Sequence, residues 1–145
     1  MATTKFELVT PSRTLYSGYA EMIVCRSVDG EIAFLANHMP YIGALDAGLV
    51  RIVGPAAEGS EEGSGEPDIR LAVSGGFVEV KDNQVIMLAD VAELASEIDR
   101  AGAERDRAEA EQRLSSAGDD GDSEADAALR WAQARLETAT GEPVH

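Results

Sequence analysis

Two histidines and one cysteine are the residues of this sequence that could most readily bind a metal ion or act as a nucleophile. His145 is the last residue, and His38 lies in the loop-like stretch 36–40. A metal site needs several converging ligands, which a single loop histidine does not supply. We therefore expect His38 to serve in local capping or in contact with a partner. Cys25 ends the apolar run MIVC at 22–25, which predicts a small buried side chain.

Two further stretches have the composition of a ligand-binding loop but not its spacing. Gly75 and Gly76 lack the lysine and helix start of a phosphate-binding loop, so they predict a tight turn or bulge. The acidic stretch DDGD at 119–122 lacks the spacing and the closing glutamate of a calcium loop. No nucleophile can be paired with a base. We therefore predict no catalytic residue, no metal site and no cofactor, and we favour a binding or structural role over an enzyme.

The charge balance restricts the partners. The 145 residues include 27 acidic and 12 basic side chains, for a net charge of −15. Such a surface repels nucleic acid and anionic lipid head groups, so partners with basic patches are expected instead. No apolar run approaches the length of about 18 residues that a spanning helix needs, so we expect no direct membrane insertion. One cysteine cannot form an internal disulfide, which fits a reducing cytosol.

The elements that must position these residues differ between the two ends of the chain. Residues 1–89 show short alternating apolar segments separated by turn residues, which is typical of an antiparallel sandwich or barrel. The candidate strands are 5–9, 20–26, 32–35, 49–53, 69–73, 77–81 and 84–88. Between the fourth and fifth of them, residues 54–68 read GPAAEGSEEGSGEPD. This acidic segment has too few apolar groups to order itself, so it predicts a mobile loop between two paired strands.

Residues 90–145 have a helical pattern. We expect Asp90 to cap a first helix with Val91, Leu94, Ile98 and Ala101 on one face, and Ser123 to begin a second helix. The expected apolar face of the second helix comprises Ala125, Ala128, Leu129, Ala132 and Leu136. Alanine buries little area, so docking of this helical hairpin should be marginal. A conformational switch and a stable appendage both remain open.

Several ordered motifs together resemble the epsilon subunit of bacterial F-type ATP synthases. They are FELVTP at 6–11, LYSG at 15–18, GEIAFLANHMP at 30–40, GLVRI at 48–52, SGGFVEV at 74–80, LADVAE at 88–93 and EID at 97–99. The resemblance implies an α+β protein, with an antiparallel β-sandwich of about ten strands followed by an antiparallel helical hairpin.

The resemblance also implies a non-catalytic subunit of the central stalk, peripheral on the cytoplasmic face of the bacterial membrane. In the family the sandwich binds the gamma subunit and the c-ring, which couples proton-driven rotation to the catalytic head. Carried over residue by residue, Glu31, His38, Met39 and Pro40 are candidate contacts to the c-ring or gamma.

The helical hairpin in many family members restrains ATP hydrolysis through transient contact with the alpha and beta catalytic subunits. The cations available for this contact are Arg105, Arg107, Arg113, Arg130 and Arg135.

The sequence departs from the family in two places. Ala33 and Ala36 replace a glycine and a proline of the first motif. ATP-sensing members carry Ile/Leu-Asp-x-x-Arg-Ala at the first helix. Ile98, Asp99 and Ala103 match this motif, but Gly102 stands where the arginine is expected. The missing guanidinium removes a charge-assisted contact to phosphate, so we predict weak or no ATP binding.

Two other functions compete with the rotor subunit. A free-standing β-sandwich adaptor with an acidic helical tail would differ in its partners. An enzyme that uses carboxylate pairs on the sandwich has no supporting spacing.

Overall fold

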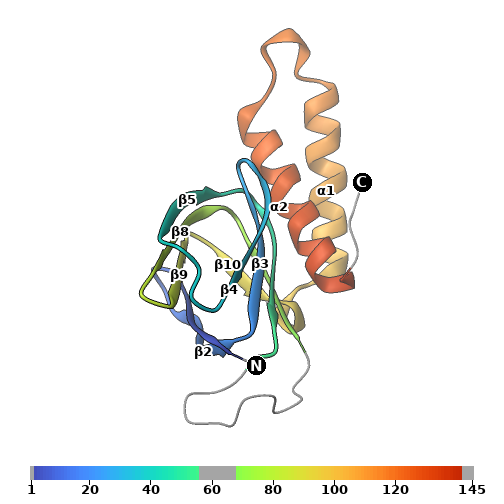
Figure 1. Cartoon of the computed structure of the whole chain (residues 1–145). Coiled ribbons are helices and arrows are strands. Elements are labelled where there is room, and N and C mark those ends of the chain that lie inside the picture. Colours follow the sequence, from blue (N-terminus) through green and yellow to red (C-terminus); the bar gives the residue numbers. More distant parts are fainter. Residues whose placement is uncertain (1, 56–67, 142–145) are drawn as a thin grey trace.

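The computed structural model describes residues 2–55 and 68–141. Within these ranges the chain forms a β-sandwich followed by a pair of helices that pack against one side of it (Figure 1). The predicted order, strands first and a helical hairpin last, is confirmed.

Ten strands build the sandwich in the described residues. Their side chains alternate between the two faces, as in the first strand, where Thr4, Phe6 and Leu8 are buried and the residues between them are partly exposed. This period of two is the pattern of a strand with one face on a core. The strands are β1 Thr4–Val9, β2 Thr14–Ala20, β3 Met22–Ser27, β4 Gly30–Leu35, β5 Tyr41–Leu45, β6 Gly48–Val53, β7 Ile69–Val73, β8 Gly76–Lys81, β9 Gln84–Ala89 and β10 Ala92–Leu94.

The strands pair in the order β10-β7-β6-β3-β5-β8-β9-β1-β2, and β4 pairs with β3 outside this path. The predicted pairing of β6 with β7 is confirmed, and β8 pairs with β9. Val28 and Asp29 form the turn between β3 and β4, and Gly30 is the first residue of β4. β1 and β9 are parallel to each other, because the long intervening chain supplies the crossover that a parallel pair requires.

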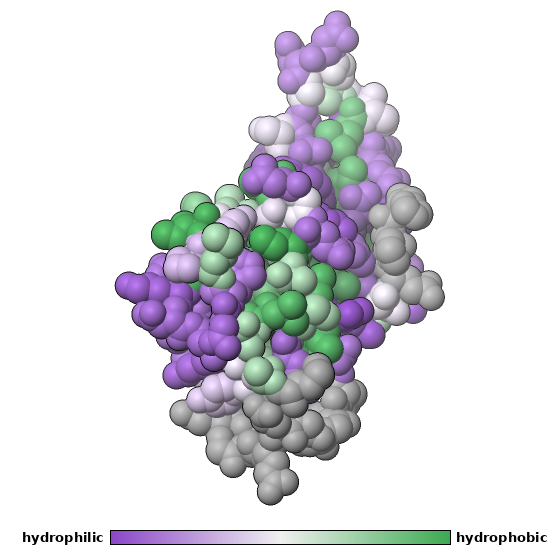
Figure 2. All heavy atoms as spheres, in the orientation of Figure 1, coloured by the Kyte–Doolittle hydropathy of each residue, from purple (hydrophilic) through white to green (hydrophobic). Residues whose placement is uncertain are grey.

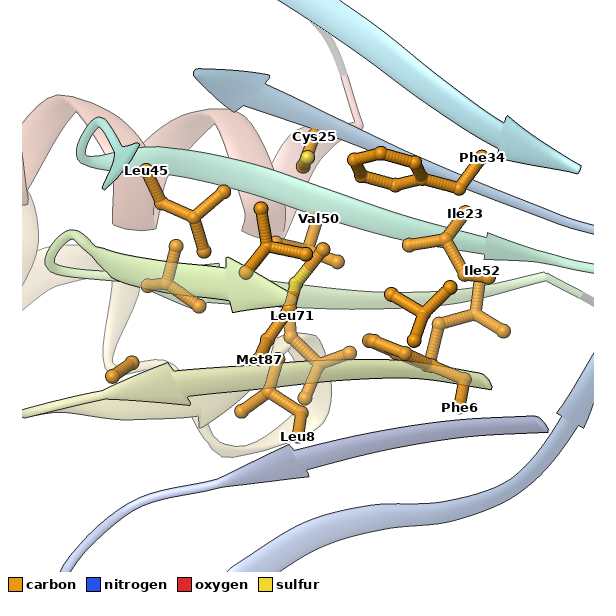
Figure 3. Packing of buried hydrophobic residues seen from close by; sticks show 14 of the residues in the cluster. Phe6, Leu8, Ile23, Cys25, Phe34, Leu45, Val50, Ile52, Leu71 and Met87 are labelled. Carbon is orange, nitrogen blue, oxygen red and sulfur yellow. The ribbon is translucent and has the colours of Figure 1, made fainter. Parts of the chain in front are cut away.

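The core of the sandwich is built from large apolar side chains of both layers. Phe6, Phe34 and Ile52 are completely buried, and Cys25 is buried beside them as predicted. Figure 3 shows these side chains directed into one shared interior. Burial of Val, Leu, Ile, Phe and Met side chains stabilises a fold by roughly 1.5–3 kcal/mol each. This core therefore makes the sandwich a rigid unit.

The helical hairpin consists of α1, Arg100–Ser115, and α2, Ser123–Thr140. The Asp99 carboxylate caps α1 by accepting the Gly102 N–H at 3.0 Å, and the Asp122 carboxylate caps α2 from Ala125 in the same way. Gly141 ends α2 in the left-handed conformation that glycine adopts without strain. Short 3-10 turns, Ala95–Glu97 and Gly118–Asp120, precede the two helices.

Parts of the helix prediction are wrong. The segment after Asp90 forms β10, which pairs with β7, so α1 begins at Arg100 instead of near Val91. Backbone pairing at the sheet edge overrides the helical spacing of the apolar residues there. The buried stripe of α1 is Gly102, Ala103 and Ala110.

In α2, Ser123 is the first helical residue and not the cap, while the predicted buried positions Ala125, Ala132 and Leu136 are confirmed. The other two predicted positions are not buried: Ala128 is exposed and Leu129 is half-buried. The buried side of α2 packs against β6 and β7 as well as against α1.

The predicted mobile loop at 54–68 lies mostly outside the described residues. No helix in the described ranges is both long enough and apolar enough to cross a bilayer.

Candidate partner-binding surfaces

The segment with the predicted contact residues consists of β4 and the loop after it. Glu31 is exposed near the start of β4. His38, Met39 and Pro40 follow the end of the strand, where the His38 N–H donates to the Leu35 carbonyl at 3.2 Å. The His38 ring contacts its Met39 carbonyl through Nδ1 at 2.7 Å and packs edge-on against Phe34. Local packing therefore holds His38 in place, and Met39 is left 72% exposed.

The structure does not bring Glu31 and His38 together. They flank opposite ends of β4, which at the rise of a β-strand separates them by about 20 Å. Glu31 instead borders a groove of about 340 Å³ that Arg26, Arg51 and Glu137 also line. The candidate contacts therefore form two separate surfaces joined by one strand.

An apolar row across four strands is a surface that the sequence analysis missed. The register places Ala44, Phe77, Leu88 and Val9 side by side on β5, β8, β9 and β1. Phe77 is 62% and Leu88 54% exposed, and both line a groove of about 370 Å³. Ile42, on the same face of β5, is 76% exposed. Exposed apolar patches of this kind mark interaction sites in soluble proteins.

The sequence contained a signal for this row. In FVEVK at 77–81, the alternation that buries Val78 and Val80 also turns Phe77 outward. The row itself depends on the register between strands distant in the chain, which the alternation of one strand does not give.

The predicted inhibitory cations take part in ion pairs on the hairpin and at its contact with the sandwich. Arg130 pairs with Asp46 of the sandwich at 3.2 Å and with Asp126. Within the hairpin, Arg107 pairs with Glu111 and Arg113 with Asp122. Arg105 is exposed on α1.

Arg135 of α2 contacts both β10 and α1, at the junction of the sandwich and the helical hairpin. Its Nε lies 2.7 Å from a Glu93 carboxylate oxygen of β10, and its Nη1 lies 3.5 Å from Asp106 of α1. The guanidinium carbon is 5.9 Å from the centre of the Trp131 ring. The buried Nε–H is not aligned for a hydrogen bond, so the contact to Glu93 is purely electrostatic. The Arg135 side chain is only 13% exposed, which strengthens this attraction relative to a surface pair.

Two arginines of the sandwich reach back to the end of α2. Arg70 Nε donates to the Thr138 carbonyl at 2.9 Å, and its Nη2 donates to the Ala139 carbonyl at 3.4 Å. A cation at these carbonyls satisfies the unpaired acceptors and the negative end of the helix dipole. Arg26 pairs with Glu137 at 3.4 Å. Charged contacts therefore fix the register of α2 on the sandwich.

No cluster of three or more potential metal ligands occurs among the described side chains. Burial, with a smaller contribution from Glu31, raises the pKa of the Cys25 thiol to about 12. A thiol that stays protonated at neutral pH is not a nucleophile.

Comparison with known proteins agrees with this arrangement of two parts. The beta-sandwich domain of the ATP synthase delta/epsilon chain matches residues 3–95, and the long alpha-helix domain of the same chain matches residues 96–140. The chain belongs to the ATP synthase delta/epsilon family. The ATP synthase epsilon chain of Shouchella clausii is 38% identical over 139 residues, which are 96% of each chain. That of Brevibacillus brevis is 42% identical over 108 residues, 74% of this chain and 75% of the relative.

A solved structure shares the fold of this family member. A chain in the cryo-EM structure of the Euglena gracilis mitochondrial ATP synthase, OSCP/F1/c-ring, superposes with a TM-score of 0.77. The match covers 97% of this chain and 82% of that chain at 22% identity. At this identity the likeness shows the fold.

The residues that match the family's ATP-binding motif have structural roles in this conformation. The Asp99 carboxylate caps α1, and Ala103 is buried in the hairpin. Ile98 is half-buried and precedes the cap. A Cβ at Gly102 would lie 2.5 Å from the Asp99 carboxylate, so a side chain there requires that carboxylate to shift. Gly102 thus suits a helix start at which Asp99 binds the backbone.

Proposed function

We propose that this family member is a non-catalytic subunit of the central stalk that binds the gamma subunit through the apolar row and the c-ring through the loops at the ends of β4. In this position it couples rotation of the c-ring to the catalytic head. The apolar row on β5, β8, β9 and β1 is the observation that carries the proposal. Four aligned apolar positions with two strongly exposed members are unexpected on a chain with a net charge of −15 unless a partner covers them.

The proposal also places the chain at the cytoplasmic face of the bacterial membrane, where its partners hold it. Glu31, Met39 and Pro40 project from the two ends of β4 and suit polar or basic loops of a c-ring. His38 supports the loop from within through its packing on Phe34.

Binding to purified gamma subunit tests the main contact. Replacing both exposed members of the row, Phe77→Glu with Leu88→Glu, should weaken binding by about 100-fold or more, because aromatic and aliphatic anchors dominate interface energies. The double variant Ala101→Glu with Ala108→Glu adds the same two charges at exposed positions of α1 and should leave the affinity unchanged. Equal affinity of the double variant and the unaltered chain would refute this assignment. Co-purification with neither gamma nor the c-ring would instead favour a free-standing adaptor.

We further propose that the helical hairpin restrains ATP hydrolysis when it leaves the sandwich and contacts the alpha and beta subunits. In the docked conformation Arg130 and Arg135 are paired with Asp46 and Glu93 of the sandwich. Undocking breaks both of these pairs and frees the two cations for acidic partner segments. A chain that ends before Ser123 should therefore raise ATP hydrolysis by the assembled enzyme, and an unchanged rate would favour a stable appendage.

Weak or absent ATP binding completes the proposal. Asp99 is engaged as a cap, and position 102 offers no guanidinium. Calorimetric titration of the isolated chain with ATP should show no micromolar affinity.

A further inference from the structure

We propose that Asn83, in the turn between β8 and β9, is the residue that positions the loop 36–40 for its contact with the c-ring. This inference rests on the proposed function, because that function gives the loop to the c-ring. It adds a residue that lies outside the loop and distant from it in the sequence. Asn83 is a positioning residue, since it acts through the loop and needs no contact of its own with the c-ring.

The backbone of the loop bends at Asn37. This residue has a φ of 61°, in the left-handed region that asparagine enters more readily than most other residues. The His38 N–H closes the bend on the Leu35 carbonyl at 3.2 Å, and the His38 ring packs on Phe34. These contacts hold the residue after the bend, whereas the Asn37 N–H has a partner outside the loop.

The partner of this N–H is the side-chain amide of Asn83, 46 residues later in the chain. Its Oδ1 accepts the Asn37 N–H at 2.7 Å, and its Nδ2 donates to the Thr3 carbonyl at 3.1 Å. Only this orientation of the amide suits both partners, because a backbone N–H can only donate and a carbonyl can only accept. One amide group therefore bridges the loop to the start of the chain and is itself held at both ends.

The turn that carries Asn83 is anchored independently of its side chain. Asp82 and Asn83 have φ values of 53° and 57°, as the central residues of a tight hairpin turn with two left-handed positions require. The Asn83 carbonyl accepts the Lys5 N–H at 3.2 Å and the Thr4 hydroxyl at 2.9 Å. The side chain of Asn83 thus extends from a fixed backbone toward the loop.

The turn and the loop belong to one polar end of the sandwich. Figure 2 shows hydrophilic residues gathered at the left edge of the sandwich, where Figure 1 places the turn between β8 and β9. Lys81 and Asp82 are exposed there, and Met39 and Pro40 are exposed on the loop. A loop that is already held in one conformation loses less conformational freedom when it binds, which strengthens the contact. The bond from Asn83 supplies this restraint.

Binding of the full chain to detergent-solubilised c-ring tests the inference. Asn83→Gly keeps the left-handed backbone, which glycine adopts freely, and removes both side-chain bonds. It should weaken binding by about 3- to 10-fold, the usual effect of one lost hydrogen bond. Asn83→Asp retains an acceptor for the Asn37 N–H and should restore binding. Asp82→Gly is the matched control in the same turn and should bind like the unaltered chain. An equal loss in Asp82→Gly would refute the inference, because stiffness of the turn would then decide the affinity.

Gamma binding separates this role from a general loss of stability. Phe77 and Leu88 pair at the opposite end of the β8–β9 hairpin from the turn. The affinity for purified gamma should therefore be the same for the unaltered chain and for Asn83→Gly. A parallel loss of both affinities would contradict a role confined to the loop.

Amide hydrogen exchange of the isolated chain gives the second measurement. The Asn37 amide should exchange about tenfold faster in Asn83→Gly, because it loses its acceptor. The Lys5 amide donates to the backbone of residue 83, so its protection should persist and reports that the turn is folded. If Asn83→Gly fails this check, the Asn37 amide of the unaltered chain decides, and free exchange there refutes the inference.

Failure of the inference can be distinguished from failure of the proposed function. If the unaltered chain binds the c-ring and Asn83→Gly binds it equally well, the role of Asn83 is refuted and the proposed function stands. If the unaltered chain does not bind the c-ring, the proposed contact itself fails, and the role of Asn83 fails with it.

Discussion

The sandwich and the helical hairpin are held together by different kinds of contact. The sandwich buries Phe6, Phe34, Leu71 and Met87 completely. The hairpin buries mainly alanine, with Leu136 as its one large buried apolar side chain among the described residues. Its remaining contacts to the sandwich include ion pairs and the Arg70 hydrogen bonds to helix carbonyls.

This difference separates a permanent part from one that can be released. Apolar burial contributes about 25 cal/mol per Å², so large side chains stabilise the sandwich far more than alanine stabilises the hairpin. Ion pairs give the hairpin a defined register, but solvent and salt weaken them. The four predictions below test this contrast, beginning with the largest expected effect.

A large-to-small substitution in the sandwich should have the greatest effect. Leu71→Ala should lower the free energy of unfolding by about 2–5 kcal/mol, the range for a buried leucine. Leu88→Ala removes the same atoms from a side chain that is 54% exposed and should change stability by less than about 0.5 kcal/mol. Chemical denaturation of both variants measures the difference. Equal losses would show that burial does not control the stability of the sandwich.

Removal of Arg135 should release the hairpin and leave the sandwich folded. Arg135→Ala leaves the half-buried Glu93 without its cation, which we expect to weaken docking by about 1–3 kcal/mol. Faster amide exchange in α2, with unchanged exchange in β6 and β7, is the expected signature. Arg105→Ala at an exposed position is the matched control. Unchanged exchange in α2 would show that alanine packing alone holds the hairpin.

Added salt should weaken docking by a smaller amount. The Arg26–Glu137 and Arg130–Asp46 pairs are partly exposed, and such pairs contribute about 0.2–1 kcal/mol each at low ionic strength. Raising the salt concentration should therefore speed exchange in α2 of the unaltered chain. The double variant Arg26→Gln with Arg130→Gln should lose most of this dependence. Salt-independent exchange in the unaltered chain would refute the electrostatic account.

The sequence predicted the contacts that depend on one segment and missed those between distant segments. Alternation identified β8 and β9, and the acidic segment at 54–68 identified the pair β6 and β7 that it joins. The helical spacing after Asp90 was misleading, because pairing of β10 with β7 is a long-range contact. Similarly, the motif at 30–40 predicted single contact residues, whereas the apolar row depends on the register of four strands.

The smallest expected effect concerns pH at the junction of sandwich and hairpin. Arg13 donates two hydrogen bonds to Glu97, at 2.9 and 2.7 Å, and the Leu94 N–H donates a third at 3.0 Å. These bonds, those from Arg13 foremost, lower the pKa of Glu97 from 4.5 to about 2. Because the pKa is lower in the folded chain than in the unfolded chain, the stabilisation is complete above the unfolded value near 4.5. It is lost as the pH falls from there toward 2.

The exposure of this pair keeps its contribution to stability small, so the titration of Glu97 itself is the better measurement. The side-chain carboxyl signal of Glu97 in NMR should reach its midpoint near pH 2 in the unaltered chain. Arg13→Ala removes the larger cause and should move the midpoint upward toward 4.5. Lys5→Ala, at another surface pair of the sandwich, is the control and should leave it unchanged. A midpoint near 4.5 in the unaltered chain would mean that Arg13 does not hold Glu97 in solution, and that the sandwich and the start of the hairpin are joined there by the backbone alone.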